Sequence, residues 1–237
     1  MRPVQLFLFE NSGIQKNEKS YRAIRHDIVR AKQSANDNEV HHPSEKIKQA
    51  TSILDNVAGW GDLSILELFA GHGNMTKIYA DYGEVLAHER NKKVYKKLVE
   101  NTKSLMLVRC VNVDSFTEFH QLISLKQNFD VIDIDAYGFP SRFFPDIFLL
   151  INDGILFITM PKPYVNILNG ITATHLTAYF GESNPSKEKI IEKFALYGLC
   201  HWRKVELLDC IDCQSIWRMA FNVVKVKATD YTGVKNK

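Results

Sequence analysis

The sequence predicts a doubly wound α/β sheet, and three observations support this fold class. Five short apolar segments of strand length alternate with segments of helix length along the middle of the chain. A glycine-rich turn directly follows the first of these strands. Two longer apolar segments, 202–211 and 216–227, come last, and the short Asp-Cys-Gln link between them favours an antiparallel hairpin. We therefore expect a mainly parallel sheet, covered by helices, that closes in a hairpin.

The alternation fixes the order of the expected elements. We expect strands near residues 64–69, 84–89, 105–112, 129–135 and 154–160. We expect helices near residues 74–82, 91–103, 115–126 and 141–152. Before the first strand, Ser44 can cap a further helix, whose apolar residues Ile47, Ala50, Leu54 and Val57 share one side.

The bulk composition is that of an ordinary globular domain. The 237 residues are 45% hydrophobic and 24% charged, and the net charge of +3 permits a nucleic-acid partner without requiring one. Four cysteines do not make a disulfide framework, and Cys210 and Cys213 stand without a second pair nearby, so we expect no metal site. The sequence shows neither a membrane span nor a signal peptide, and we expect a cytoplasmic protein.

The first 42 residues form an N-terminal extension to the main domain, which we place at 43–230. A short apolar tag is followed by a basic amphipathic helix over about 17–32 and then by a polar linker. In the helix, Tyr21, Ile24 and Ile28 recur at helical spacing, and lysines and arginines occupy the other positions. That basic side fits either a solvated face or a nucleic-acid contact.

The turn after the first strand has the composition of a ligand-binding loop. Gly71 and Gly73 lack a Cβ, so the backbone can adopt positive φ and approach a ligand closely. The helix beyond them offers free N–H groups to an anionic group. A dinucleotide-binding fingerprint would have a third glycine where Thr76 stands, which argues against NAD.

This turn resembles motif I of the S-adenosylmethionine (SAM)-dependent methyltransferases. In that family, the aminocarboxypropyl end of the cofactor lies over the turn. The resemblance implies SAM as cofactor and a Rossmann-like sheet of seven strands with the last one antiparallel. It also implies cofactor contacts from Glu67, Phe69, Gly71 and Gly73.

Two further acids follow the next two strands. Glu89 ends the second strand, where a carboxylate can accept hydrogen bonds from both ribose hydroxyls. Asp114 follows the third strand, where the acid of this family commonly receives the adenine amino group, and Phe116 would cover the ring. Each acid alone fits a solvated strand end, but in α/β sheets these ends line the ligand crevice.

The fourth strand carries Asp133 and Asp135, which share one face because they are two residues apart. Two acids in an apolar strand are costly unless they have hydrogen-bonding partners, which favours a functional explanation. Asp135 to Gly138 is a variant of the [D/N]-P-P-[Y/F] motif of amino-methylating enzymes, with Ala136 in place of proline. We therefore predict catalytic contributions from Asp133, Asp135 and Tyr137, and a cofactor contact from Asp135.

The longer pattern D-x-I-D-x-D-x-Y-G-x-P resembles motif IV of the tRNA guanosine dimethyltransferases. The resemblance spans about residues 42–160 and implies that Asp135 and the Ala136 carbonyl accept the N–H groups of an exocyclic amine while Tyr137 stacks on the base. The departures are Ala136, Phe139 in place of a small residue, and the C-terminal domain of those enzymes, which we do not find in this sequence.

A second resemblance favours DNA as the substrate. The segment His42–Lys46 is similar to the H-P-[T/S]-x-K element, motif X, of DNA amino methyltransferases, although Ile47 replaces the following proline. A plain helix start explains the same residues. In such enzymes the region 161–200 often holds substrate-recognition segments, where Tyr179, Phe180 and Lys187 would contact a base or phosphate, or would serve as packing residues.

The N-terminal tag matches a known docking peptide. The pentapeptide Gln5-Leu6-Phe7-Leu8-Phe9 has the pattern Q-L-x-L-F by which bacterial proteins bind the replicative sliding clamp. Such a peptide inserts its leucine and phenylalanine into an apolar groove while glutamine makes polar contacts. We predict clamp contacts from Gln5, Leu6, Leu8 and Phe9; the alternative is a hydrophobic plug against the core.

These patterns predict a SAM-dependent methyltransferase that acts on an exocyclic amine of a nucleic-acid base, with DNA slightly favoured over tRNA. Two alternatives stay open: a catalytically silent adaptor that binds nucleic acid or the clamp, and a methyltransferase for small molecules or proteins. The last of these predicts an enclosed pocket under residues 161–200.

Overall fold

The computed structural model describes residues 42–57, 63–136, 138–162, 170–213 and 216–227. The chain divides into two units, Met1–His42 and Pro43–Lys237, and the fold below is that of the second unit. Three of the predicted features lie outside the described residues: the basic helix over 17–32, the tag residues Gln5, Leu6, Leu8 and Phe9, and the expected stacking residue Tyr137.

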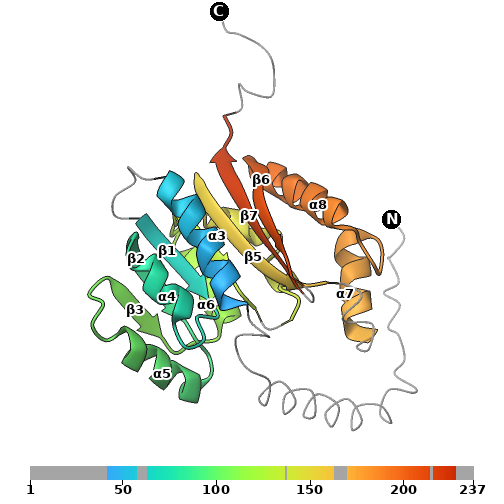
Figure 1. Ribbon diagram of the computed structural model, residues 1–237. Helices are drawn as coiled ribbons and strands as arrows, with labels where there is room; N and C mark the ends of the chain where they lie inside the picture. Colours follow the sequence, from blue (N-terminus) through green and yellow to red (C-terminus); the bar gives the residue numbers. More distant parts are fainter. Residues whose placement is uncertain (1–41, 58–62, 137, 163–169, 214–215, 228–237) are drawn as a thin grey trace, which may run out of the picture. The chain divides into compact units, whose positions relative to one another are not determined.

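Seven strands of the described chain form one sheet in the order β3-β2-β1-β4-β5-β7-β6 (Figure 1). The strands are β1 (Leu63–Leu68), β2 (Gly83–His88), β3 (Val108–Val111), β4 (Val131–Ile134), β5 (Gly154–Pro161), β6 (Arg203–Asp212) and β7 (Ile216–Lys225). Strands β1 to β5 pair in parallel, whereas β7 is antiparallel to both β5 and β6. This arrangement confirms the predicted doubly wound sheet with a C-terminal antiparallel hairpin.

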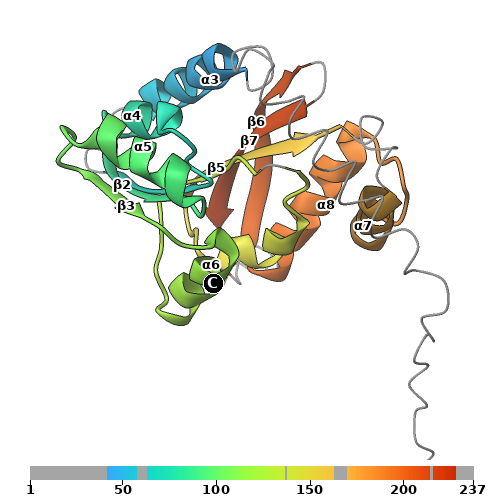
Figure 2. The same ribbon diagram turned by 90° about the horizontal axis from the view of Figure 1, so that it is seen from below.

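Helices cover both faces of the sheet (Figure 2). The α-helices are α3 (Pro43–Asn56), α4 (Asn74–Tyr79), α5 (Lys92–Thr102), α6 (Ser115–Ser124), α7 (Gly170–Phe180) and α8 (Lys187–Cys200). Buried side chains of α3, α4 and α5 pack on one face, and those of α6, α7 and α8 pack on the other. We call the edge at which β1 to β5 end the carboxyl edge; in Figure 1, β5 points down towards it and β7 points up, away from it.

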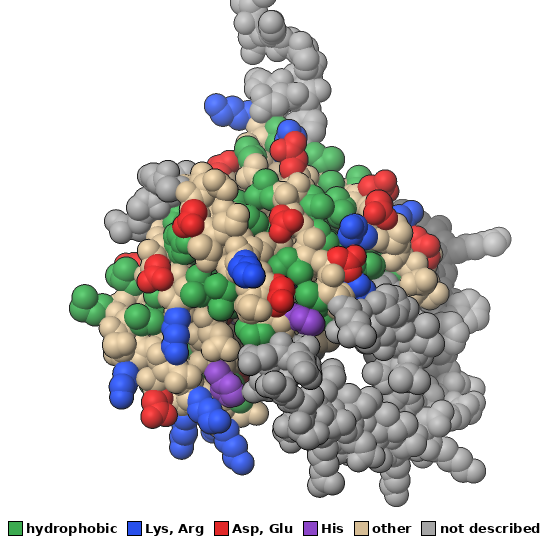
Figure 3. Space-filling view, viewed as in Figure 1, with side chains coloured by type: hydrophobic (Ala, Val, Ile, Leu, Met, Phe, Trp, Pro, Cys, Tyr) green, Lys and Arg blue, Asp and Glu red, His purple; other side chains and the backbone are tan. Residues whose placement is uncertain are grey.

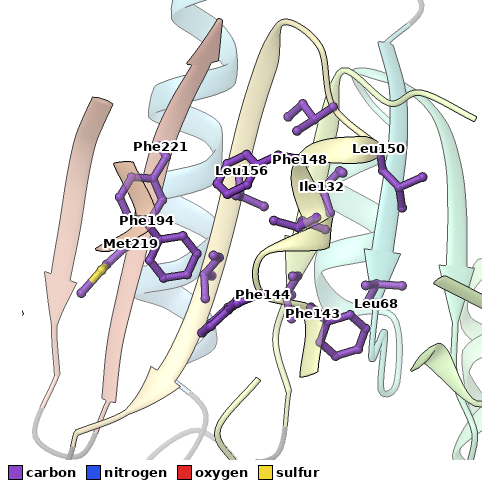
Figure 4. Close-up of a cluster of buried hydrophobic side chains, with 14 of the residues drawn as sticks. Leu68, Ile132, Phe143, Phe144, Phe148, Leu150, Leu156, Phe194, Met219 and Phe221 are labelled. Carbon is purple, nitrogen blue, oxygen red and sulfur yellow. The ribbon is translucent and has the colours of Figure 1, made fainter. Parts of the chain in front are cut away.

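The larger core lies on the face covered by α6, α7 and α8. Aromatic side chains fill it, and Phe194 of α8 stacks on Phe221 of β7 with ring centroids 5.3 Å apart (Figure 4). From Gly154 to Met160, β5 is buried on both sides, as expected for a central strand between two helical layers. The sheet is therefore held rigidly from both faces.

Two of the predicted elements differ clearly from the structure. The helix expected over 141–152 is instead two 3₁₀ turns, Ser141–Phe143 and Asp146–Leu149. Pro145 separates them, because it lacks an N–H and holds Phe144 in an extended conformation (φ −83°, ψ 139°). The expected strand 105–112 is shorter, since the N–H of Val108 closes a turn on Leu105.

Helix α3 begins at Pro43 rather than after a Ser44 cap. Proline is well suited to a first helical position, because its missing N–H would have had no partner within the helix. Ser44 lies in the first turn and donates a hydrogen bond to its neighbour Glu45 at 2.8 Å. The expected apolar side of this helix is present, with Ala50 and Leu54 buried.

Candidate functional site

The glycine turn at the end of β1 has an unusual backbone that leaves space for a ligand. Phe69, Gly71 and Gly73 all have positive φ, at 71°, 58° and 83°. A Cβ at Gly71 would meet no atom within 4 Å, whereas one at Gly73 would lie 2.7 Å from Leu98 of α5. Gly73 is therefore needed for helix packing, and Gly71 borders open space at the carboxyl edge.

Glu89 follows β2 and holds this turn from the side. Its Oε2 accepts a hydrogen bond from the N–H of Gly71 at 3.2 Å, and its Oε1 accepts one from the N–H of Asn91 at 2.6 Å. Asn112 donates to the Glu89 carbonyl at 2.7 Å. The structure thus places Glu89 beside the glycine turn, and its expected contact with the ribose hydroxyls stays a prediction.

Asp114 and Phe116 lie at the start of α6. Asp114 caps this helix, because its Oδ1 accepts hydrogen bonds from the N–H groups of Phe116 and Thr117 at 3.1 and 3.2 Å. Partial burial opposes ionisation, but the hydrogen bonds from Thr117 and Arg90 outweigh it, so the pKa of Asp114 lies below its ordinary value. The guanidinium of Arg142 lies 3.8 Å from the centre of the Phe116 ring. Both side chains therefore have protein partners, and their expected adenine contacts stay predictions.

Glu67 is buried under the turn, 3% exposed. Thr76 donates a hydrogen bond to its Oε2 at 2.5 Å, which explains why a threonine rather than a third glycine stands at that position. Burial raises the pKa of Glu67 well above its usual range, and the Thr76 hydroxyl offsets this only in part. Any contribution of Glu67 to ligand binding is therefore made from beneath the turn.

Asp133 is locked into a buried ion pair. Arg218 of β7 donates to both of its carboxylate oxygens, at 3.0 and 2.9 Å, and the Tyr79 hydroxyl donates to Oδ2 at 2.7 Å. The side chains of Arg218 and Asp133 are 0% and 1% exposed. Both carboxylate oxygens of Asp133 thus have buried protein partners, and the catalytic role expected for Asp133 stays a prediction.

Asp135 directly follows β4 and lies nearer the solvent than Asp133, with 26% of its side chain exposed. Lys46 of α3 donates a hydrogen bond to its Oδ2 at 2.5 Å, and the Lys46 side chain is 6% exposed. Burial opposes the charged carboxylate, but Lys46, Arg218 and a hydrogen bond from Thr159 outweigh it, so the pKa of Asp135 lies below its usual value of 3.8. The structure therefore keeps an ionised, partly accessible carboxylate at the carboxyl edge.

Sequence reasoning missed the residues that hold these two acids. Lys46 falls within the H-P-[T/S]-x-K element, so the motif contained the signal, but nothing local connects it to a residue 89 positions away. Arg218 left a weaker signal, a lone arginine in the apolar run of the last strand. Thr159 receives a hydrogen bond from Arg218 at 2.9 Å and thereby links the two acid sites.

The predicted substrate-contact residues lie on α7 and α8. Phe180 is buried at 4% exposure and serves the core, whereas Tyr179 is half-buried. Tyr179, Phe180, Lys189, Lys193 and Leu196 are among the residues lining a groove of about 360 Å³ between the two helices. Lys187 lies at the start of α8 and, after Lys162 and Trp217, contributes to holding the pKa of Asp212 below its ordinary value.

Comparison with known proteins shows which solved structures have a similar fold. No protein-family model and no curated protein matches the sequence. The structure is similar to Trm1 from Pyrococcus horikoshii in complex with S-adenosyl-L-methionine, with a TM-score of 0.59 and 14% identity over 78% of this chain and 56% of that one. It is also similar to Trm5b from Pyrococcus abyssi, with a TM-score of 0.52 and 17% identity over 75% and 48%. The chain has a Rossmann-like methyltransferase fold.

A third structure with the methyltransferase fold matches over more of its own length. Magnesium protoporphyrin IX methyltransferase (ChlM) from Synechocystis PCC 6803 with bound SAM has a TM-score of 0.55 and 11% identity, over 88% of this chain and 92% of that one. By contrast, this chain spans about half the length of Trm5b and Trm1.

Among the described residues, no helix is long and apolar enough to cross a membrane.

Proposed function

We propose that this protein is a SAM-dependent methyltransferase that transfers a methyl group to an exocyclic amine of a nucleic-acid base. One observation carries the proposal: Asp135, an ionised and partly exposed carboxylate at the carboxyl edge, accepts a hydrogen bond from a nitrogen donor, the ammonium of Lys46. The site is therefore already suited to an N–H group. Ligands of α/β sheets bind outside this edge of the sheet.

The glycine turn fits the proposed cofactor. The open space at Gly71 allows close approach of a ligand to the backbone, and Glu89 lies hydrogen-bonded to this turn. We propose that Gly71, Glu89 and Phe69 contact SAM directly and that Glu67 and Gly73 support the turn from below. When bound, SAM would supply a methyl group on a sulfonium centre, which makes that carbon electrophilic.

The chemistry asked of Asp135 is to orient a weak nucleophile. The lone pair of an exocyclic amine is delocalised into the base, so the nitrogen attacks poorly while it stays planar. A carboxylate and the Ala136 carbonyl that accept its N–H groups would favour a pyramidal nitrogen. The amine would supply the electron pair for the new bond to the methyl carbon that SAM gives up, and Asp135 or water would accept the amine proton. Alignment of the reacting atoms would supply much of the rate.

The preference for DNA over tRNA rests on α3. The His42–Lys46 element resembles one of DNA amino methyltransferases, and the structure gives its lysine a direct contact with Asp135. The tRNA alternative has its support in the pattern of the fourth strand and in the likeness of the fold to Trm1. A base inside a duplex would have to leave the stack to reach Asp135.

Methyl transfer from tritiated SAM to DNA and to tRNA, measured in parallel, tests the proposal. We expect incorporation into one of them, and Asp135→Ala should lower its rate by at least 100-fold, since the amine would lose its acceptor. Asp81→Asn, at an exposed acid in the turn after α4, is the matched control. Equal rates in wild type and Asp135→Ala would refute the chemistry assigned to Asp135.

We further propose that the tag tethers the protein to a bacterial sliding clamp. Support comes from the sequence Gln5-Leu6-Phe7-Leu8-Phe9 alone, because these residues lie outside the described ones. Pull-down of purified clamp should fail when Leu8 and Phe9 are both changed to alanine. If the double variant retains the clamp as well as wild type does, the tethering proposal is wrong.

A small molecule as methyl acceptor is the second candidate. The match to nearly the full length of ChlM favours it, although the described residues of the 161–200 region form a groove between α7 and α8 and not the enclosed pocket that this candidate predicts. Transfer of tritium to a fraction of small metabolites, without transfer to either nucleic acid, would support this candidate over the first. A silent adaptor is distinguished by calorimetry, because it would bind no SAM.

A further inference from the structure

Helix α5 carries a concentrated positive charge. Four of its first six residues are the exposed lysines Lys92, Lys93, Lys96 and Lys97, which we call the basic face of α5. The exposed Arg90, with 76% of its side chain accessible, precedes them. Figure 3 shows lysine and arginine side chains gathered over α5, at the lower left of the molecule.

These charges oppose the stability of the helix that carries them. Lys92 and Lys96, and likewise Lys93 and Lys97, are like-charge pairs four residues apart, which repel each other on a helix surface. They also lie at the positive end of the helix dipole, and the first turn has no acidic residue to balance them. Among the described residues, none of the four lysines forms an ion pair. Folding therefore does not account for this cluster.

The basic face adjoins the candidate site. Three residues, Glu89 to Asn91, separate the carboxyl end of β2 from the start of α5. Asn101 donates to the carbonyl of His72 at 2.9 Å, and Leu98 packs against Gly73, so the helix is fastened to the glycine turn. The start of α5 therefore lies at the same edge of the sheet as Asp135, which follows β4.

We infer that the basic face of α5 binds the phosphate backbone of the nucleic-acid substrate. This inference rests on the proposed function and adds to it the surface that holds the substrate. Lysine ammonium groups bind phosphates as point charges without reading sequence, so they would set the position of the strand while Asp135 selects the amine. Flexible side chains on a fixed helix suit this purpose.

Binding of a fluorescent duplex DNA, followed by anisotropy over a series of salt concentrations, tests the inference. Lys92→Gln/Lys96→Gln removes one like-charge pair and should leave the fold intact, which unchanged SAM binding by calorimetry would verify. The control, Lys126→Gln/Lys225→Gln, removes two exposed lysines at the opposite edge of the sheet. If both α5 lysines contact phosphates, the slope of log K against log[salt] should fall by about two, and affinity at 0.1 M salt by about 60-fold.

The methyl-transfer assay supplies the second readout. The α5 variant should show a lower kcat/KM for nucleic acid with an unchanged kcat at saturating substrate, because binding rather than chemistry is affected. If wild type methylates nucleic acid and both lysine variants keep its salt slope, the inference is wrong and the proposed function stands. If wild type binds and methylates no nucleic acid, both fail. The inference would also be wrong if Lys92→Gln/Lys96→Gln weakened binding to anionic lipid vesicles but left the affinity for DNA unchanged.

Discussion

Replacement of Lys46 by methionine should destabilise the protein by about 2 kcal/mol at pH 7. The variant leaves the charged carboxylate of Asp135 without its ammonium partner. Breaking a fully buried pair costs about 3–5 kcal/mol, and an exposed pair contributes about 0.2–1 kcal/mol. Lys46 is 6% exposed and Asp135 is 26% exposed, so the cost should fall between these limits. For a domain of this size, 2 kcal/mol corresponds to a fall in Tm of about 4–8 °C.

The dependence of this effect on pH identifies its cause. In the wild type, the pKa of Asp135 is held below 3.8, so the pair contributes stability above that pH and loses it as the pH falls through the folded-state pKa. In Lys46→Met the desolvated carboxyl has a raised pKa and can become protonated at less acidic pH. The difference in unfolding free energy between the two proteins should therefore be full at pH 7, begin to shrink as the pH falls through the raised pKa of the variant, and continue to shrink until the pH has passed the lowered folded-state pKa of the wild type.

Urea unfolding at several pH values measures this difference. Lys48→Met is the matched control, because Lys48 lies on the same helix and is exposed. We expect the control to remain within about 0.5 kcal/mol of wild type at each pH. If Lys46→Met is as stable as Lys48→Met at pH 7, or if its deficit does not change with pH, the ion pair is not what holds Asp135.

Three further predictions concern the buried network and the turn. Arg218→Met should destabilise by about 3–5 kcal/mol in urea unfolding, since it leaves Asp133 charged and enclosed, and Asp133→Leu in the same chain should recover part of the loss. Gly71→Ala should weaken SAM binding in calorimetry. Gly181→Ala is the control, because Gly181 also has a positive φ and open surroundings; this variant should carry the same kind of backbone strain and bind SAM as wild type does. Burial and the nearby Arg109 lower the pKa of His88 to about 4. Between pH 6.5 and 5 the unfolded chain therefore takes up a proton that the native chain does not, and the free energy of unfolding should fall by about 2 kcal/mol. His88→Leu should abolish that fall. Equal binding by the two alanine variants, or an unchanged acid response in His88→Leu, would contradict the reasoning.

The arrangement of strands could be predicted from the sequence because it depends on patterns that repeat locally. Apolar segments of strand length alternate with helical periodicity, and this decides both the fold class and the direction of the strands. The prediction failed at 141–152, where apolar residues at helical spacing suggested a helix. There Pro145 overrides the periodicity, because it removes an N–H and constrains the residue before it.

The candidate site was only partly predictable, because its acids were found but their partners were not. Glu89 and the glycine turn could be found from the sequence because each follows one of two consecutive strands. The pairing of Asp135 with Lys46 and of Asp133 with Arg218 depends on packing between segments 89 and 85 residues apart. No local pattern encodes such a contact. From the sequence alone, Asp133 and Asp135 were therefore both predicted to be catalytic, and nothing distinguished the buried acid from the partly exposed one.

Burial, rather than residue type, decides which acid of this face a bound molecule could reach. Glu67 and Asp133 are neighbours in the register of β1 and β4, and both are almost fully enclosed. The first is driven towards its neutral form by desolvation, and the second has its oxygens occupied by Arg218 and Tyr79. Asp135, two residues after Asp133 and just beyond the end of β4, keeps its charge through Lys46 and yet retains contact with solvent. Of these three acids, Asp135 is therefore the one whose carboxylate the proposed amine substrate could reach.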